Sequence, residues 1–147
     1  MELRRVLVGV DGSPASAAAA RWAAQAVGDG GEVVVLYAIG TALIGQAARS
    51  AATGLGIFPH EKGGPKEEAR RVLDQWCLPL RDSGVRYRTV VSDADPVRAL
   101  IHHGRREDAD LIVIGHQGDT GVLHRLVQGL SDHLIDHAKR PVVVVPG

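Results

Sequence analysis

The stretch Val113-Ile114-Gly115-His116-Gln117-Gly118 joins an apolar run to two glycines spaced three residues apart. A strand is predicted over 110–114, and its apolar residues from Leu111 to Ile114 are typical of a strand buried on both faces. Glycines directly after a strand let the backbone approach a ligand closely, and N–H groups at the start of a following helix suit a phosphate. Gly129-Leu130-Ser131 and Pro141-Val142-Val143-Val144-Val145 come next, so this part of the chain predicts a strand, a glycine loop, a helix and a final strand over 142–145.

A second glycine-containing loop follows the first predicted strand. Val6-Leu7-Val8-Gly9-Val10 is a short apolar run, and Asp11-Gly12-Ser13 comes directly after it. Ser13-Pro14 is typical of a helix cap followed by proline at the first helical position, ahead of an alanine-rich helix over 15–27. If the first and fourth strands are neighbours, the two loops face one crevice.

The remaining segments continue the alternation of strands and helices. Strands are predicted over 32–39 and 85–91, the latter at a sheet edge, and helices over 65–83, 96–106 and 120–138. Gly28 and Gly84 are expected helix stops, and Pro79 is expected to kink or end its helix. The alternation implies a parallel sheet with helices on both faces and right-handed crossovers. For a strand order of 3-2-1-4-5, the winding reverses between the first and fourth strands, where ligands bind in such sheets.

The sequence therefore predicts an α/β three-layer sandwich with a five-stranded parallel sheet of order 3-2-1-4-5, as a single domain over 1–147. Residues 40–64 form a variable loop that is rich in glycine and small residues. A loop of this length inside a compact domain is usually functional or mobile. It is a lid, a partner surface or a disordered segment, and we expect partial disorder.

The amino-acid composition argues against some classes of binding partner. The chain has 147 residues, with 17 Lys+Arg against 17 Asp+Glu and only 3% aromatic residues. This balance predicts neither nucleic-acid binding nor an anionic membrane partner. The single cysteine, Cys77, cannot form an internal disulfide and is expected in the core, which suits a reducing cytoplasm. The N-terminal residues do not have a signal-peptide layout, and no apolar run approaches the ~20 residues of a membrane span.

Four segments together resemble the universal stress protein family over nearly the full length of the chain. They are the opening strand and loop over 6–13, Val-Leu-Tyr-Ala-Ile over 35–39, Ala-Asp-Leu-Ile-Val-Ile-Gly over 109–115 and Arg-Pro-Val-Val-Val-Val over 140–145. The resemblance implies the adenine-nucleotide α-hydrolase-like fold, a role in stress response and usually a homodimer in which strand 5 takes part in the pairing.

One branch of this family binds ATP through Gly, two residues, Gly, nine residues, then Gly-Ser or Gly-Thr. Gly115 and Gly118 match the first two glycines. Gln128 then stands in the place of the third glycine and Gly129 in the place of the hydroxyl residue; alternatively, Gly129 acts as the third glycine with a spacing of ten. A glutamine side chain there either blocks the phosphate or donates a hydrogen bond to it. Loss of the hydroxyl removes a donor worth about 0.5–1.5 kcal/mol when neutral.

The resemblance also implies roles for individual residues. Asp11 and the backbone of Gly9 and Val10 would meet the adenine, and Ala38 would line its pocket. The ribose and phosphates would be held by Gly115, Gly118, Gly129, Leu130 and Ser131. The alternatives are that Asp11 only closes a turn with Gly12, that the glycines only separate a strand from a helix, and that Ser131 is a surface hydroxyl. The ligand would be ATP or another adenine nucleotide, with the presence of Mg²⁺ left open.

The sequence contains no recognisable catalytic set. The Gly-x4-Gly-Lys-Ser/Thr and Gly-x-Ser-x-Gly motifs are both absent, so any ATP hydrolysis is expected to be slow and incidental. His133 and His137 lie four apart on a predicted helix, but two histidines flanked by aspartates are more typical of a solvated face than of a zinc site. His116 is either a phosphate donor or an exposed loop residue. His102-His103 comes at a helix end, where the dipole favours positive charge.

Three functions follow, in order of preference. The first is a cytoplasmic stress-response protein that binds an adenine nucleotide as a sensor or regulatory module. The second is a dimerisation or partner-interaction module that binds no nucleotide and acts through strand 5 or residues 40–64, as the Gln128-Gly129 pair suggests. The third, supported by fold analogy alone, is an enzyme of the wider adenine-nucleotide α-hydrolase-like class.

Overall fold

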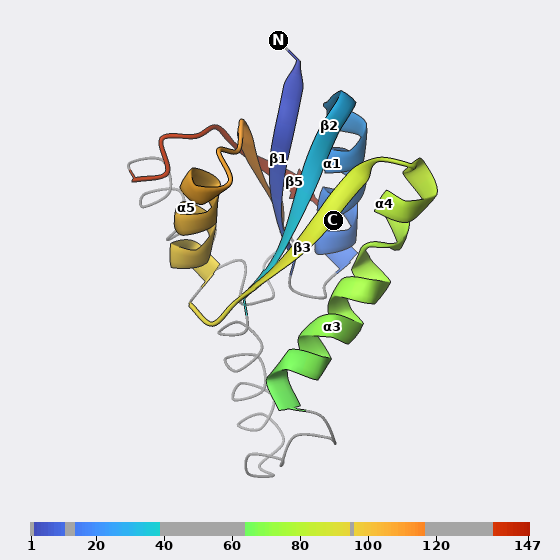
Figure 1. The fold of residues 1–147 in the computed structure, drawn as a ribbon, viewed down its shortest axis with the longest axis vertical. Helices are drawn as coiled ribbons and strands as arrows, with labels where there is room; N and C mark the ends of the chain where they lie inside the picture. Colours follow the sequence, from blue (N-terminus) through green and yellow to red (C-terminus); the bar gives the residue numbers. More distant parts are fainter. Residues whose placement is uncertain (1, 11–13, 39–63, 95, 117–136) are drawn as a thin grey trace.

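The computed structural model describes residues 2–10, 14–38, 64–94, 96–116 and 137–147. Their elements are β1 (Leu3–Val10), α1 (Pro14–Ala26), β2 (Val27–Ala38), α3 (Gly64–Trp76), α4 (Leu78–Ser83), β3 (Arg86–Ser92), α5 (Pro96–Arg106), β4 (Leu111–His116) and β5 (Val142–Pro146), as Figure 1 shows. The predicted loop over 40–64 and most of the predicted helix over 120–138 lie outside the described residues.

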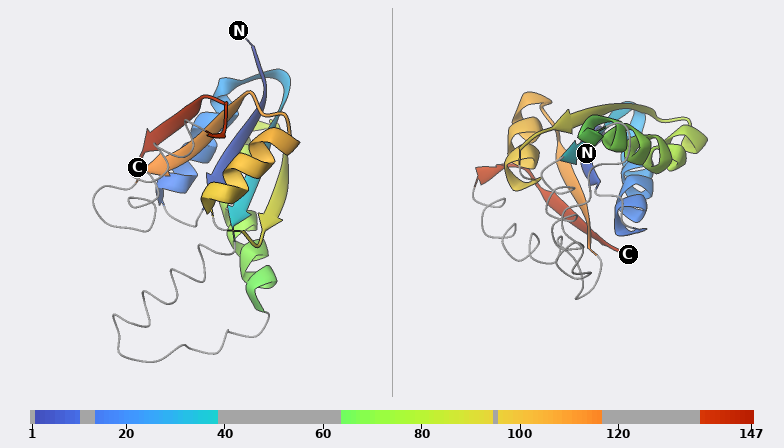
Figure 2. Two further views of the ribbon diagram at one scale, coloured as in Figure 1. Left: turned by 90° about the vertical axis from the view of Figure 1, so that its left-hand side faces the viewer. Right: turned by 90° about the horizontal axis from the view of Figure 1, so that it is seen from below.

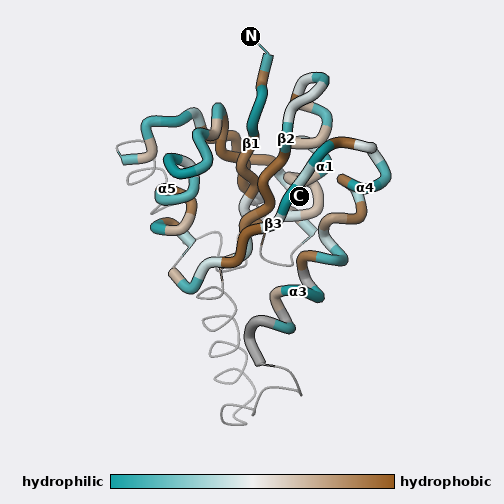
Figure 3. The backbone as a smooth tube through the Cα atoms, in the orientation of Figure 1, coloured by the Kyte–Doolittle hydropathy of each residue, from teal (hydrophilic) through white to brown (hydrophobic). Residues whose placement is uncertain are grey.

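The five strands form one parallel sheet in the order β3-β2-β1-β4-β5, as predicted. Val8 of β1 lies between Val35 of β2 and Val113 of β4, and Val113 in turn pairs with Val143 of β5. These central positions are valines because a strand in the middle of a parallel sheet is covered on both faces. The hydropathy colouring of Figure 3 shows the apolar residues concentrated in these central strands.

Two helical layers cover the two faces of the sheet. Alternate residues of the strands pack with buried residues of α1, α3 and α4, and the intervening residues pack with Ala99 and Leu100 of α5. Figure 2 shows α5 on one side of the sheet and the other three helices on the opposite side. The three-layer sandwich follows from the period of two in a strand, which gives each strand an apolar residue on either face.

Several element boundaries differ from the sequence prediction. Helix α1 ends at Ala26, before the expected stop at Gly28, because Val27 already pairs with Leu3 at the start of β2. The predicted helix over 65–83 is two helices separated by Cys77, and Pro79 lies in the first turn of α4, where a proline ring costs no hydrogen bond. Gly84 ends α4 with a φ of 74°, as expected for a left-handed cap. Strand β3 lies at a sheet edge, as predicted.

Candidate functional site

The carboxyl ends of β1 and β4 lie side by side in the sheet. Gly9, next to the end of β1, pairs with Leu36 of β2 on one side and with Ile114 of β4 on the other. The chain winds outward from β1 to β2 and β3, and outward from β4 to β5, so the winding reverses between β1 and β4. This is the place where open α/β sheets bind their ligands, and the predicted adjacency of the first and fourth strands is confirmed.

Gly9 packs against the α5 layer. A Cβ atom at this position would lie 3.2 Å from Leu100 Cδ2 and 3.7 Å from Ile114 Cγ2. Both neighbours are ends of side chains, so the glycine makes room for a tight apolar contact between β1 and α5. Leu100 is therefore part of the support for this edge.

Gly115 packs against the opposite layer, at the start of α1. A Cβ atom at this position would lie 2.3 Å from the Ala15 carbonyl oxygen and 2.8 Å from the Ser16 nitrogen. Gly147 lies against the same turn, because a Cβ there would be 2.8 Å from Ala15 Cβ. The glycine at 115 thus allows the end of β4 to touch the first turn of α1, the helix that follows the Asp11-Gly12-Ser13 segment in the chain. Sequence reasoning had assigned Gly115 to a ligand or to a turn and had not identified Ala15.

The other described candidate residues are small and apolar. Val10 is 5% exposed and belongs to the α1 face, whereas Ala38 is 4% exposed and belongs to the α5 face. Ala38 ends β2, which neighbours β1, and pairs with Ser92 at the end of β3. The structure thus brings Gly9, Val10, Ala38 and Gly115 to one edge of the sheet. Outside the described residues lie Asp11, Gly12, Ser13, Gly118, Gln128, Gly129, Leu130, Ser131 and His133.

The opposite, amino edge of the sheet holds an ion-pair network. Glu32 lies within 3.6 Å of arginine nitrogens on Arg5, Arg86 and Arg88, and Arg88 also pairs with Glu107. The hydrogen bond from Arg88 lowers the pKa of Glu107, and the two carboxylates raise the pKa of Arg88. A polar hollow of about 480 Å³ adjoins this network, lined by residues at the starts of β1, β2 and β3. The network joins β1, β2 and β3 to the end of α5 and lies away from the candidate site.

Asp110 ties the start of β4 to β1 at the same amino edge. Its Oδ2 accepts the backbone N–H of Arg4 at 2.8 Å and of Arg5 at 3.0 Å. These two bonds lower the pKa of the carboxyl group, because both stabilise its charged form. Asp110 therefore has a structural role, in holding β4 in register beside β1.

The histidines of the described residues form no metal site. In the part of the chain that the structure describes, no group of three or more His, Cys, Asp or Glu residues could hold a metal ion. The backbone oxygen of His137 accepts a hydrogen bond from Arg105 at 2.6 Å. Burial and the neighbouring His102 lower the pKa of His103, so its neutral form is favoured.

Comparison with known protein families shows to which family the chain belongs. The model of the universal stress protein family matches residues 2–146. The chain belongs to this family. A universal stress protein of Methanocaldococcus jannaschii is 24% identical over 145 residues, which cover 97% of this chain and 81% of that protein. A universal stress protein of Mycolicibacterium smegmatis is 31% identical over 145 residues, and here the chain spans about half of the relative, 48% of its length.

Solved structures of other family members share the fold. A universal stress protein in complex with cAMP superposes with a TM-score of 0.62 at 22% identity, covering 99% of this chain and 98% of the other. The universal stress protein of Archaeoglobus fulgidus in complex with dAMP gives a TM-score of 0.64 at 19% identity, covering 99% of both chains. These likenesses place the sheet order of this universal stress protein among adenine-nucleotide α-hydrolase-like folds.

Cys77 lies in the core of this universal stress protein, as expected. It is 1% exposed, at the junction of α3 and α4, and burial raises the pKa of its thiol to about 11. A thiol with such a pKa is almost entirely protonated at neutral pH and is a poor nucleophile. Among the described helices, none is long and apolar enough to cross a membrane.

Proposed function

We propose that this universal stress protein binds an adenine nucleotide, ATP or a close relative, at the carboxyl edge of β1 and β4, and acts as a sensor or regulatory module in stress response. The adjacency of these two strand ends carries the proposal. Asp11-Gly12-Ser13 follows one strand in the chain and Gln117-Gly118 follows the other, so two glycine-containing segments start from neighbouring positions. Such segments present backbone N–H groups to phosphate.

Two further features support an adenine ligand. The described candidate residues Gly9, Val10, Ala38 and Gly115 are small or apolar and bring no charge to this edge of the sheet, which suits an uncharged aromatic ring. Similarly folded family members have been solved in complex with cAMP and with dAMP. In this proposal Asp11 and the backbone of Gly9 and Val10 meet the base. The phosphates and ribose are held by Gly115, Gly118, Gly129, Leu130 and Ser131, with Mg²⁺ accompanying a triphosphate.

Isothermal titration with ATP, ADP, AMP and cAMP, each with and without Mg²⁺, tests the proposal directly. We expect saturable heat for at least one nucleotide, and its absence with folded protein would refute the assignment. In the variant Asp11→Ala, affinity should fall by about 10- to 150-fold, since a hydrogen bond to a charged group is worth about 1.5–3 kcal/mol. Asp29→Ala is the matched control, because Asp29 is exposed near the amino edge and its loss should leave the affinity unchanged.

In this proposal the protein is not an enzyme in its main role. Neither the Gly-x4-Gly-Lys-Ser/Thr motif nor the Gly-x-Ser-x-Gly motif occurs in the sequence, so no recognised catalytic set supports an enzymatic role. Any ATP hydrolysis is then slow and incidental. A phosphate-release assay with saturating ATP measures it, and turnover at the rates of ordinary enzymes would contradict a purely regulatory role.

We further propose that the protein is a cytoplasmic homodimer that pairs through β5. This strand lies at the sheet edge, hydrogen-bonds to β4, and exposes 43% of Val144. An edge strand with an exposed valine is a surface on which a second copy can pair. Native mass spectrometry should give a dimer mass for the wild-type chain and a monomer mass for Val144→Lys, while Val91→Lys on the other edge strand is the control. Cell fractionation tests the compartment.

The residues at positions 128 and 129 favour a second candidate function, that of a partner-interaction module. Gln128 and Gly129 depart from the glycine-hydroxyl pair of the ATP-binding branch, which suits a partner-interaction module that binds no nucleotide. The double substitution Gln128→Gly with Gly129→Ser rebuilds that pair. If titration detects ATP only after this change, the second function is correct; if the wild-type chain already binds, the first one is.

A further inference from the structure

Helix α5 carries basic side chains and no acidic one. Residues Pro96–Arg106 include five basic side chains, Arg98, His102, His103, Arg105 and Arg106, and neither aspartate nor glutamate, although the whole chain has 17 Lys+Arg against 17 Asp+Glu. Solvated helices usually intersperse charges of both signs along their exposed face. The segregation on α5 therefore marks this helix as different from an ordinary polar surface.

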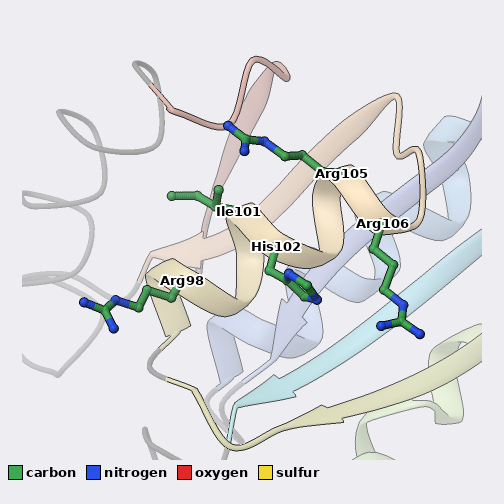
Figure 4. A pocket seen from close by; sticks show the side chains of 5 residues that line it. All are labelled: Arg98, Ile101, His102, Arg105 and Arg106. Carbon is green, nitrogen blue, oxygen red and sulfur yellow. The ribbon is translucent and has the colours of Figure 1, made fainter.

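The exposed cations share one face of the helix. Arg98, His102 and Arg105 follow at spacings of four and three residues, and Arg106 lies beside them, while Leu100 and Gly104 are buried on the opposite side. Arg98 and Arg105 are seven residues apart, which corresponds to about 10 Å along the helix axis. With Ile101, these four residues line a shallow hollow of about 500 Å³, and Figure 4 shows their side chains on the outer surface of α5.

The positive heads at the end of this face are not neutralised within the described residues. Arg105 donates one hydrogen bond from Nη2 to the backbone oxygen of His137, a neutral acceptor, so further N–H donors remain. No described carboxylate forms an ion pair with Arg105 or Arg106. The guanidinium groups of Arg105 and Arg106 are therefore not paired with any described carboxylate, and they can form ion pairs with an incoming anion.

The dimensions and chemistry of this face of α5 indicate which type of ligand it would bind. Cations spread over about 10 Å match several separate anionic groups better than a single phosphate or carboxylate. Ile101 between them offers an apolar contact of the kind that a peptide side chain makes. A nucleic acid would need a wider basic surface, and the zero net charge of the chain gives it no long-range attraction. The occupant that fits is a short acidic stretch of polypeptide with an apolar residue among its acids.

We propose that Arg98, His102, Arg105 and Arg106, around Ile101 on the outer face of α5, form a docking surface for an acidic segment of a partner protein. This surface is on the outer side of α5, and the inner side of the same helix packs against Gly9 through Leu100. The proposal does not depend on nucleotide binding at the carboxyl edge. Failure of either one therefore leaves the other intact.

Fluorescence anisotropy with a labelled decapeptide of glutamates and two leucines tests the docking surface. We expect saturable binding at low NaCl that weakens at high NaCl, and no binding of the same peptide with glutamine in place of glutamate. The variant His102→Glu with Arg106→Glu should weaken binding by about tenfold, because the positive charge of Arg106 is reversed and a second negative charge is added beside it at an exposed site. These two positions make no hydrogen bond or ion pair to another described residue, so their substitution leaves the fold undisturbed.

The matched control is Arg21→Glu with Arg70→Glu, which reverses two exposed arginines on α1 and α3, in the other helix layer. It should change the affinity by less than about twofold, since the peptide would not contact these helices. An NMR titration of the wild-type chain gives an independent map, with the largest amide shifts expected in α5. Absence of binding at low salt, an equal loss in the control, or shifts centred outside α5 would overturn the proposal. Tighter binding of single-stranded DNA or anionic vesicles through α5 would overturn the assignment to a protein partner.

Discussion

Substitution of Gly115 by alanine should strongly destabilise the protein. The added Cβ would lie 2.3 Å from the Ala15 carbonyl oxygen, 2.4 Å from the Ala15 carbonyl carbon and 2.8 Å from the Ser16 nitrogen. Non-bonded heavy atoms settle at about 3.5–4.0 Å, so β4 and α1 would have to separate by about 1 Å. All three contacts are backbone atoms in a helix, which no rotamer change can move away.

The expected cost of Gly115→Ala is about 3 kcal/mol, at the upper end of overpacking penalties, because the clash involves backbone rather than a flexible side chain. This is a large share of the ~5–15 kcal/mol by which a domain is usually stable. Urea unfolding followed by circular dichroism measures it as a lower midpoint with an unchanged slope.

Gly104→Ala is the matched control for this experiment. A Cβ at position 104 would lie 3.1 Å from Ile112 Cδ1, the end of a side chain that can shift slightly. Replacing a glycine inside a helix also gains about 0.5–1 kcal/mol, so the net change should stay within about 1 kcal/mol of zero. If Gly115→Ala were as stable as this control but lost nucleotide binding, the glycine would serve the ligand and the packing argument would be refuted.

Three further outcomes are expected. Leu80→Ala should lower the free energy of unfolding by about 2–5 kcal/mol because Leu80 is fully buried, whereas Leu78→Ala, at a residue 49% exposed, should change the urea midpoint little. The Cys77 thiol, with its pKa raised to about 11, should not react with a disulfide reagent at pH 8 in the native protein but should react fully in urea; native reactivity would contradict its burial. The lowered pKa of Asp110 stabilises the fold above about pH 4, and this contribution is lost as pH falls through the folded-state pKa. Asp110→Asn should therefore be less stable than wild type at pH 7 and approach it in acid, and a gap that persists in acid would show a cause other than charge.

The strands were predictable because their signal is local. Runs such as Val6-Leu7-Val8 and Leu111-Ile112-Val113 are apolar on both faces, and the alternation with helices restricts the connections to a few topologies. The helix boundaries were less predictable. The break at Cys77 and the early end of α1 at Ala26 depend on packing and on the pairing of Val27 with Leu3, which no local pattern contains.

The resemblance implied Gly9, Val10, Ala38 and Gly115 as site residues, and the sheet order shows that they lie at one edge of the sheet. Their part in binding a ligand stays a prediction. The sequence did not predict that Gly115 faces the backbone of Ala15, because that contact joins residues 100 positions apart across two layers. It also did not predict the lowered pKa of His103, since burial is a property of the folded state.

The sequence by itself determined the strands and their alternation with helices, because apolar periodicity is a local property of the chain. The family was indicated by the resemblance of four segments, and the family model over residues 2–146 confirms it. Only the tertiary structure showed which neighbour requires a glycine at each position. Gly9 leaves room for the side chain of Leu100, and Gly115 leaves room for the first turn of α1. The tertiary structure also decided that Arg105 and Arg106 of α5 are exposed and form no ion pair with a described carboxylate, while Arg86 and Arg88 of the amino edge are paired with Glu32 and Glu107. The physical reason is that short-range periodicity governs local conformation, whereas steric contact and charge pairing depend on distances between atoms that the fold alone sets.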